Sequence, residues 1–159
     1  MPDQTYVQQL QAMSPIELVR EYHEQWLRAC LERIRDGDAE NLARTCANII
    51  THTNANAVLD SIATWREGGE YEWLLEQHPE VSRMTTVDAM LLFYRTKVES
   101  TEERIENGEY TRLYEVLEVA DFLKEYNYAI IVLESISDES ELAPMRHWLW
   151  RNLGETDPE

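Results

Sequence analysis

Apolar residues recur along most of the chain at the three- and four-residue spacing of amphipathic helices, and no segment shows the alternation of a half-buried strand. The clearest start signal is Ser14-Pro15-Ile16-Glu17. Ser14 can cap the helix, Pro15 has a preset φ for its first turn, and Glu17 stands where a capping box needs a carboxylate. Asp36-Gly37 ends the apolar pattern, so we expect a long helix between these signals, after a short one over 5–12.

The same spacing predicts further helices along the rest of the chain. Asp38 can cap the next one, which the cluster Thr51-His52-Thr53-Asn54 either kinks or ends. Later helices are expected over 70–77, from Thr85 or Thr86 to Gly108, over 110–126 with Leu113, Leu117 and Ala120 facing inward, over 128–136, and over 145–153 opened by Ser140 or Pro144. The segment 128–136 is β-branched enough for a buried strand, but without a partner strand we interpret it as a buried helix.

These segments predict an all-α fold, a single-domain compact bundle of about six to eight helices over 1–159 with a short flexible C-terminal end from about 154. A length of 159 residues suits one domain, and 43% hydrophobic residues suffice for a core. No run approaches the 18 apolar residues of a membrane span, and the N-terminus lacks a signal-peptide pattern. We therefore expect a cytoplasmic protein with no membrane partner.

The charge is strongly acidic: 31 Asp and Glu against 14 Lys and Arg give a net charge of −17. Direct binding to nucleic acid is disfavoured, because phosphate contacts need Lys and Arg. Aromatic residues are spread along the whole chain, so the charge belongs to a folded surface and not to a disordered acidic tail. The window 99–141 holds 13 acids and 3 bases, a local net charge of −10.

Within this window seven acids follow helical spacing and form two rows. Four residues at i, i+3, i+4 and i+7 share one helix face, and three at i, i+3 and i+7 share a face of the next: Glu99, Glu102, Glu103 and Glu106, then Glu118, Asp121 and Glu125. The four like-charge neighbour pairs of the first row cost about 1–2 kcal/mol before screening, and the row lies where the helix dipole disfavours acids. Stability alone does not select this arrangement.

We therefore predict that the rows bind a protein partner with a basic surface, without chemistry of the chain's own. The sharpest form is a nucleic-acid mimic that inhibits a DNA- or RNA-binding protein, since two rows side by side approach one charge per ~3 Å. The alternatives are an adaptor, chaperone or assembly protein with an apolar or aromatic interface, a small helical enzyme, a salt-adapted surface and a generic solvated surface. Salt adaptation fits less well, because Glu outnumbers Asp by 23 to 8.

Catalytic and metal-binding patterns are not found, so no catalytic residue, metal or cofactor is predicted. The four histidines lie on different segments, without Glu-x-x-His or His-x-x-x-His spacing, and His23 fits a core position. An enzyme would instead need a pocket with a perturbed titratable group near His23 or His52. Cys30 and Cys46 have neither a disulfide-framework nor a zinc spacing, and we interpret them as small apolar-face residues.

The stretch 145–151 is locally basic and contains Trp148 and Trp150, which lie about 200° apart around a helix. Both cannot face one core. We expect one to be buried and the other either to pack under a neighbouring helix or to anchor a protein interface, with a homodimer as one such assembly.

Overall fold

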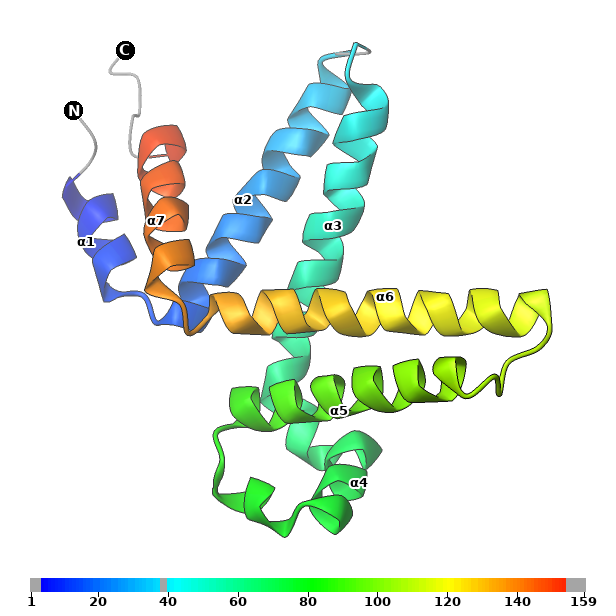
Figure 1. Ribbon diagram of the computed structural model, residues 1–159. Helices are drawn as coiled ribbons and strands as arrows, with labels where there is room; N and C mark the ends of the chain where they lie inside the picture. Colours follow the sequence, from blue (N-terminus) through cyan, green and yellow to red (C-terminus); the bar gives the residue numbers. More distant parts are fainter. Residues whose placement is uncertain (1–3, 38–39, 154–159) are drawn as a thin grey trace. The chain divides into compact units, whose positions relative to one another are not determined.

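A computed structural model describes residues 4–37 and 40–153, and all regular secondary structure within them is helical (Figure 1). This confirms the all-α prediction. The described residues form seven α-helices and two short 3₁₀ helices, in this order: α1 (Gln4–Ala12), α2 (Pro15–Arg35), α3 (Leu42–Ser61), η1 (Ile62–Glu67), α4 (Gly69–Gln77), η2 (Pro79–Arg83), α5 (Thr86–Glu106), α6 (Leu113–Ser135) and α7 (Glu139–Leu153).

The N-terminus of α2 is the capping box that the sequence predicts. The Ser14 hydroxyl accepts a hydrogen bond from the backbone N–H of Glu17, and the Glu17 carboxylate accepts one from the backbone N–H of Ser14 at 2.9 Å. Two of the N–H groups that a helix start leaves unpaired are thereby satisfied. At the other end Gly37 has φ +77°, a left-handed conformation that a residue with a Cβ adopts only with strain.

Helix α3 runs without interruption through the Thr51–Asn54 cluster, so the cluster does not end the helix. Thr and Asn are poor helix formers, but the difference from Ala is at most about 0.7 kcal/mol per residue. Burial of Ala55 and Leu59 on the same helix can outweigh such a difference. The expected cap at Asp38 lies outside the described residues.

Helices α5 and α6 form a hairpin, and α6 differs from prediction. Of the two expected starts of α5, Thr85 is the N-cap, and its hydroxyl accepts a hydrogen bond from the backbone N–H of Asp88. The two helices predicted over 110–126 and 128–136 are one continuous helix, α6. The inward orientation predicted for its first half is wrong, because the side chains of Leu113 and Leu117 are 76% and 58% exposed and Ala120 is exposed too.

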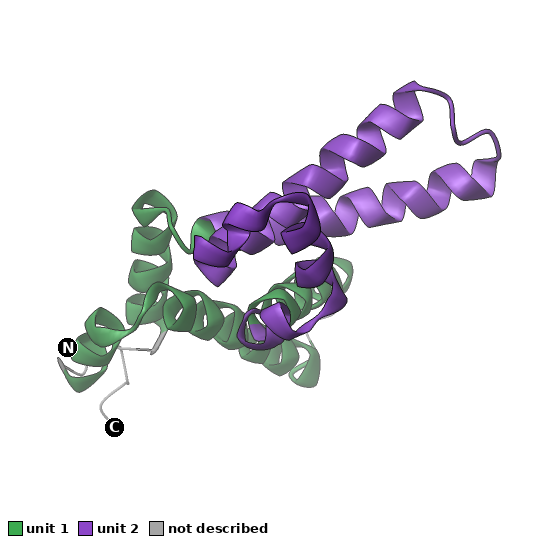
Figure 2. Cartoon of the chain, turned by 90° about the horizontal axis from the view of Figure 1, so that it is seen from below, with its two compact units in different colours: residues 1–59, 135–159 green, residues 60–134 purple. Residues whose placement is uncertain are grey.

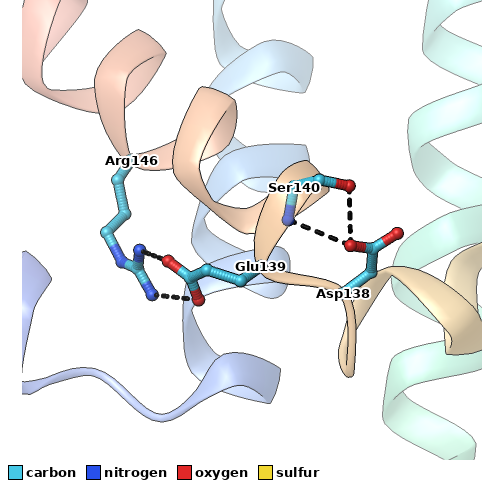
Figure 3. Close-up of polar contacts among 4 residues, drawn as sticks. All are labelled: Asp138, Glu139, Ser140 and Arg146. Atoms are coloured by element: carbon cyan, nitrogen blue, oxygen red, sulfur yellow. Dashed lines mark hydrogen bonds and ion pairs between the residues drawn. The ribbon is translucent and has the colours of Figure 1, made fainter.

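Helix α7 begins earlier than predicted, and Pro144 lies inside it. Its start is stabilised by side chains, as Figure 3 shows. The Asp138 carboxylate accepts hydrogen bonds from the backbone N–H and the hydroxyl of Ser140, at 2.9 and 2.6 Å. Glu139 receives two hydrogen bonds from the guanidinium of Arg146, which holds the pKa of its carboxyl below the usual range and raises that of the arginine.

The described chain divides into two compact units, coloured separately in Figure 2: residues 1–59 with 135–159, and residues 60–134. In the first, α7 packs against α1 and α2, and Leu18, Val19, Cys30 and Leu149 are buried. In the second, α4 packs against η1, η2 and α5. Its side chains with almost no exposure are Leu74, Val81, Ala89, Met90 and Leu133. The expectation of a single domain stays a prediction, and the C-terminal end from 154 lies outside the described residues.

None of the described helices combines the length and the apolar composition needed to cross a membrane.

Candidate functional site

The first acidic row lies on the half of α5 nearest the loop to α6. All four side chains are exposed, and none forms an ion pair with another described residue: Glu99, Glu102, Glu103 and Glu106. The nearest candidate for neutralising Glu99 is Arg95, but its guanidinium donates to Glu134 of α6 at 2.7 Å instead. The row therefore presents four solvent-exposed carboxylates that no described cation pairs with.

The second row lies on the half of α6 nearest the same loop. Its three members are exposed and form no ion pair with another described residue: Glu118, Asp121 and Glu125. Glu125 also acts on its neighbour Tyr126. The pKa of that phenol is raised, first by burial and then by the charges of Glu70 and Glu125.

The hairpin carries the two rows on opposite faces. Tyr94 and Tyr126 mark where α5 and α6 meet, since their ring centroids lie 5.9 Å apart. At about 100° per residue, the α5 row is rotated about 80–180° around the helix axis from Tyr94, in the sense in which the helix winds from N- to C-terminus. The α6 row is rotated about 80–140° from Tyr126 in the opposite sense. In an antiparallel pair, opposite rotations lead to opposite faces. The rows thus form two separate acidic edges, and the juxtaposition that would imitate nucleic-acid charge density is not found among the described residues.

An apolar row, whose spacing predicts core positions, borders the acidic row of α6. Leu113, Leu117, Ala120 and Ile131 lie within about 60° of one another around the helix, and all four are exposed, Ile131 by 60%. The exposed Lys124 lies in the same sector and separates Ile131 from the first three. Asp121 is one turn from Leu117 and adjoins Ala120. Isolated exposed apolar residues are ordinary, but a row along one helix face is typical of an interaction surface.

In the first unit, aromatic side chains from three helices form a cluster around two histidines. Trp26 of α2 stacks between His52 of α3 and Trp148 of α7, with centroid separations of 5.4 and 5.0 Å and interplanar angles of 10° and 16°. Tyr22 meets the edges of His23, His52 and Trp148. Offset-stacked and edge-to-face contacts of this kind contribute about 0.5–1.5 kcal/mol each beyond their buried area.

The Nδ1 atoms of His23 and His52 are 2.7 Å apart, so one ring donates and the other accepts a single shared proton. Burial and the neighbouring His52 lower the pKa of His23 to about 4, and burial also lowers that of His52. The pair is therefore neutral at physiological pH. The prediction that His23 is a hydrogen-bonded core residue is confirmed, whereas its partner 29 positions away could not be read from the sequence.

The two candidate interface tryptophans differ in their surroundings. Trp148 is half-buried in the aromatic cluster, where its ring lies 5.5 Å from Tyr22. Trp150 is also half-buried, with its ring 5.7 Å from that of His147. Helix packing therefore accounts for Trp148, and an interface role for Trp150 stays a prediction.

Among the described residues, no group of three or more His, Cys, Asp or Glu side chains is arranged to hold a metal ion. Cys30 is buried and Cys46 exposed, both as free thiols. Comparison with known proteins yields no match to a family model, to a curated protein or to a solved structure.

Proposed function

We propose that this protein is a non-enzymatic binding protein whose α5–α6 hairpin takes up a protein partner with a basic surface. The observation that carries the proposal is the surface of α6, where an exposed apolar row runs beside unpaired acids. An amphipathic helix with apolar residues along one line and Lys or Arg beside it is complementary to this surface. The apolar row supplies buried area, and the acids supply orientation and faster association.

A basic partner fits better than a second copy of the chain. Each copy carries a net charge of −17. Self-association through α6 would bring unpaired acids together in an interface that excludes water, where the lower dielectric strengthens their repulsion. The acidic row of α5 lies on the opposite edge and does not contact a partner bound to α6, but it adds long-range attraction for that basic partner. The mimic form of the hypothesis stays a prediction, and it lacks the support that adjacent rows would give. A cytoplasmic location belongs to the same proposal, and free thiols at Cys30 and Cys46 are compatible with a reducing compartment.

The proposal is tested with a synthetic helical peptide that carries a Leu row beside a Lys row, and with a scrambled peptide of equal composition. We expect saturable binding of the first peptide only, weakening as salt rises. Reversing Glu118, Asp121 and Glu125 to Lys should abolish binding. The matched α5 variant, with Glu99, Glu102, Glu103 and Glu106 reversed, should mainly slow association.

Leu117→Ser provides the apolar control, because it leaves every charge in place. It should weaken binding by about tenfold, since a fully buried leucine contributes about 1.5–3 kcal/mol. Equal binding of both peptides, or α6 variants that bind like the wild type, would refute the proposed surface. A wild type that forms dimers resistant to high salt would favour the assembly alternative.

A further inference from the structure

A pocket in the first unit has a chemical character opposite to that of the rest of the surface. It has a volume of about 260 Å³ and is lined by residues from the second half of α2, the first half of α3 and the segment just before α3: Trp26, Arg33, Asn41, Arg44, Thr45 and Asn48. No carboxylate is among the residues that line it, although acids outnumber bases by 31 to 14 in the chain. The lining is therefore positively charged within a strongly negative protein.

The two arginines of the pocket have no charge partner among the described residues. Several of the other arginines on the described surface, though not all, are paired, as Arg28 is with Glu24 and Arg146 with Glu139. Arg33 and Arg44 form no such ion pair or hydrogen bond within the described chain. Arg44 also lies in the first turn of α3, where the helix dipole disfavours a cation. Helix stability alone does not favour this placement.

The remaining lining side chains are also able to donate hydrogen bonds. Asn41 and Asn48 carry amide N–H groups, and the buried Thr45 carries a hydroxyl. The indole Nε1 of Trp26, another lining residue, is buried without a hydrogen-bond partner. Guanidinium, amide and hydroxyl donors around a small volume are complementary to the oxygens of a phosphate or a carboxylate. A volume just below the range for drug-sized ligands suits a small molecule.

We propose that this pocket binds a small oxyanionic ligand, a phosphate or carboxylate compound, through Arg33 and Arg44 with Asn41, Thr45 and Asn48 as further donors. The site lies on other helices than the α5–α6 hairpin, and it does not depend on the proposed partner binding. Since the net charge of −17 repels anions in general, saturable anion binding would require a local site of this kind.

The test is a ¹H–¹⁵N NMR titration of the full chain with inorganic phosphate and, separately, with succinate, against sodium chloride at matched ionic strength. We expect saturable shifts confined to Asn41, Thr45, Asn48 and the Trp26 indole, from phosphate, succinate or both, and none from chloride. Whichever of phosphate and succinate binds with the lower Kd identifies the ligand class. Arg33→Gln and Arg44→Gln should each raise the Kd at least about tenfold, the effect of one charge-assisted contact.

Arg83→Gln is the matched control, because Arg83 is exposed on η2 and does not line the pocket. It should leave the Kd unchanged, and unshifted resonances elsewhere should show that all three variants keep the fold. The proposal is overturned if neither anion gives saturable shifts, if chloride gives the same shifts, or if Arg83→Gln weakens binding as much as the pocket variants do.

Discussion

Acidification should destabilise the protein through the buried pair His23 and His52. The unfolded chain binds a proton at each histidine near pH 6.5, whereas the pKa of His23 in the fold is about 4. Above about pH 6.5 both states are neutral at this position, and its contribution to stability is fully present. As the pH falls below 6.5, only the unfolded state takes up the proton, so stability is lost until the pH reaches about 4.

The size of the loss follows from the two pKa values. Between about pH 7 and about pH 4.5, a histidine with its pKa shifted from 6.5 to about 4 removes about 2 kcal/mol from the free energy of unfolding. His52 adds a loss of the same sign, because burial lowers its pKa too. The first physical cause is burial, which disfavours the charged imidazolium. In addition, a second proton would place two N–H groups against each other across the 2.7 Å contact.

Urea unfolding, followed by tryptophan fluorescence at about pH 7 and about pH 4.5, measures this loss. The many carboxylates also titrate in this range, so the informative quantity is the difference between the wild type and His23→Gln. The wild type should lose about 2 kcal/mol more than the variant, and the exposed-site control His147→Gln should follow the wild type. Parallel losses in the wild type, His23→Gln and His52→Gln would refute the reasoning.

Three further substitutions test the helices themselves. Ser14→Ala should lower the free energy of unfolding by about 1 kcal/mol in chemical denaturation, because it removes the α2 cap. Glu102→Lys should raise the melting temperature at low salt, by relieving about 0.5–1 kcal/mol of like-charge repulsion on α5, and the gain should disappear at high salt. Leu117→Ala should change stability by less than about 0.5 kcal/mol, whereas Leu133→Ala, fully buried on the same helix, should cost about 2–5 kcal/mol.

Local signals account for what the sequence predicted well. The capping box at Ser14, the cap at Thr85 and the positive-φ glycine at 37 each depend on residues within four positions, so their outcome could be read without tertiary information. Helix α6 shows the opposite case. Its apolar residues surround most of the helix, and periodicity cannot say which side meets a neighbour. The inward side is decided by Tyr126 meeting Tyr94, a contact across 32 positions.

The candidate site divides in the same way. Shared-face spacing placed the members of each acidic row together, because helix geometry alone fixes that relation. Whether the two rows adjoin depends on how α5 and α6 face each other, and they do not adjoin. The His23–His52 contact and the pocket around Arg33 and Arg44 each join residues of α2 and α3. Contacts between residues of two different helices cannot be predicted from the residue spacing within either helix.

The discontinuity of the first unit has a consequence for synthesis on the ribosome. Its first 59 residues are made before residues 60–134, and its last helix follows them. Trp26 stacks on Trp148, so one face of its indole stays uncovered while the intervening segment is translated. At about 5–20 residues per second this interval is about 4–15 s. The aromatic face of α2 is therefore covered only after α7 has been translated, so the packing of this unit is completed late in synthesis.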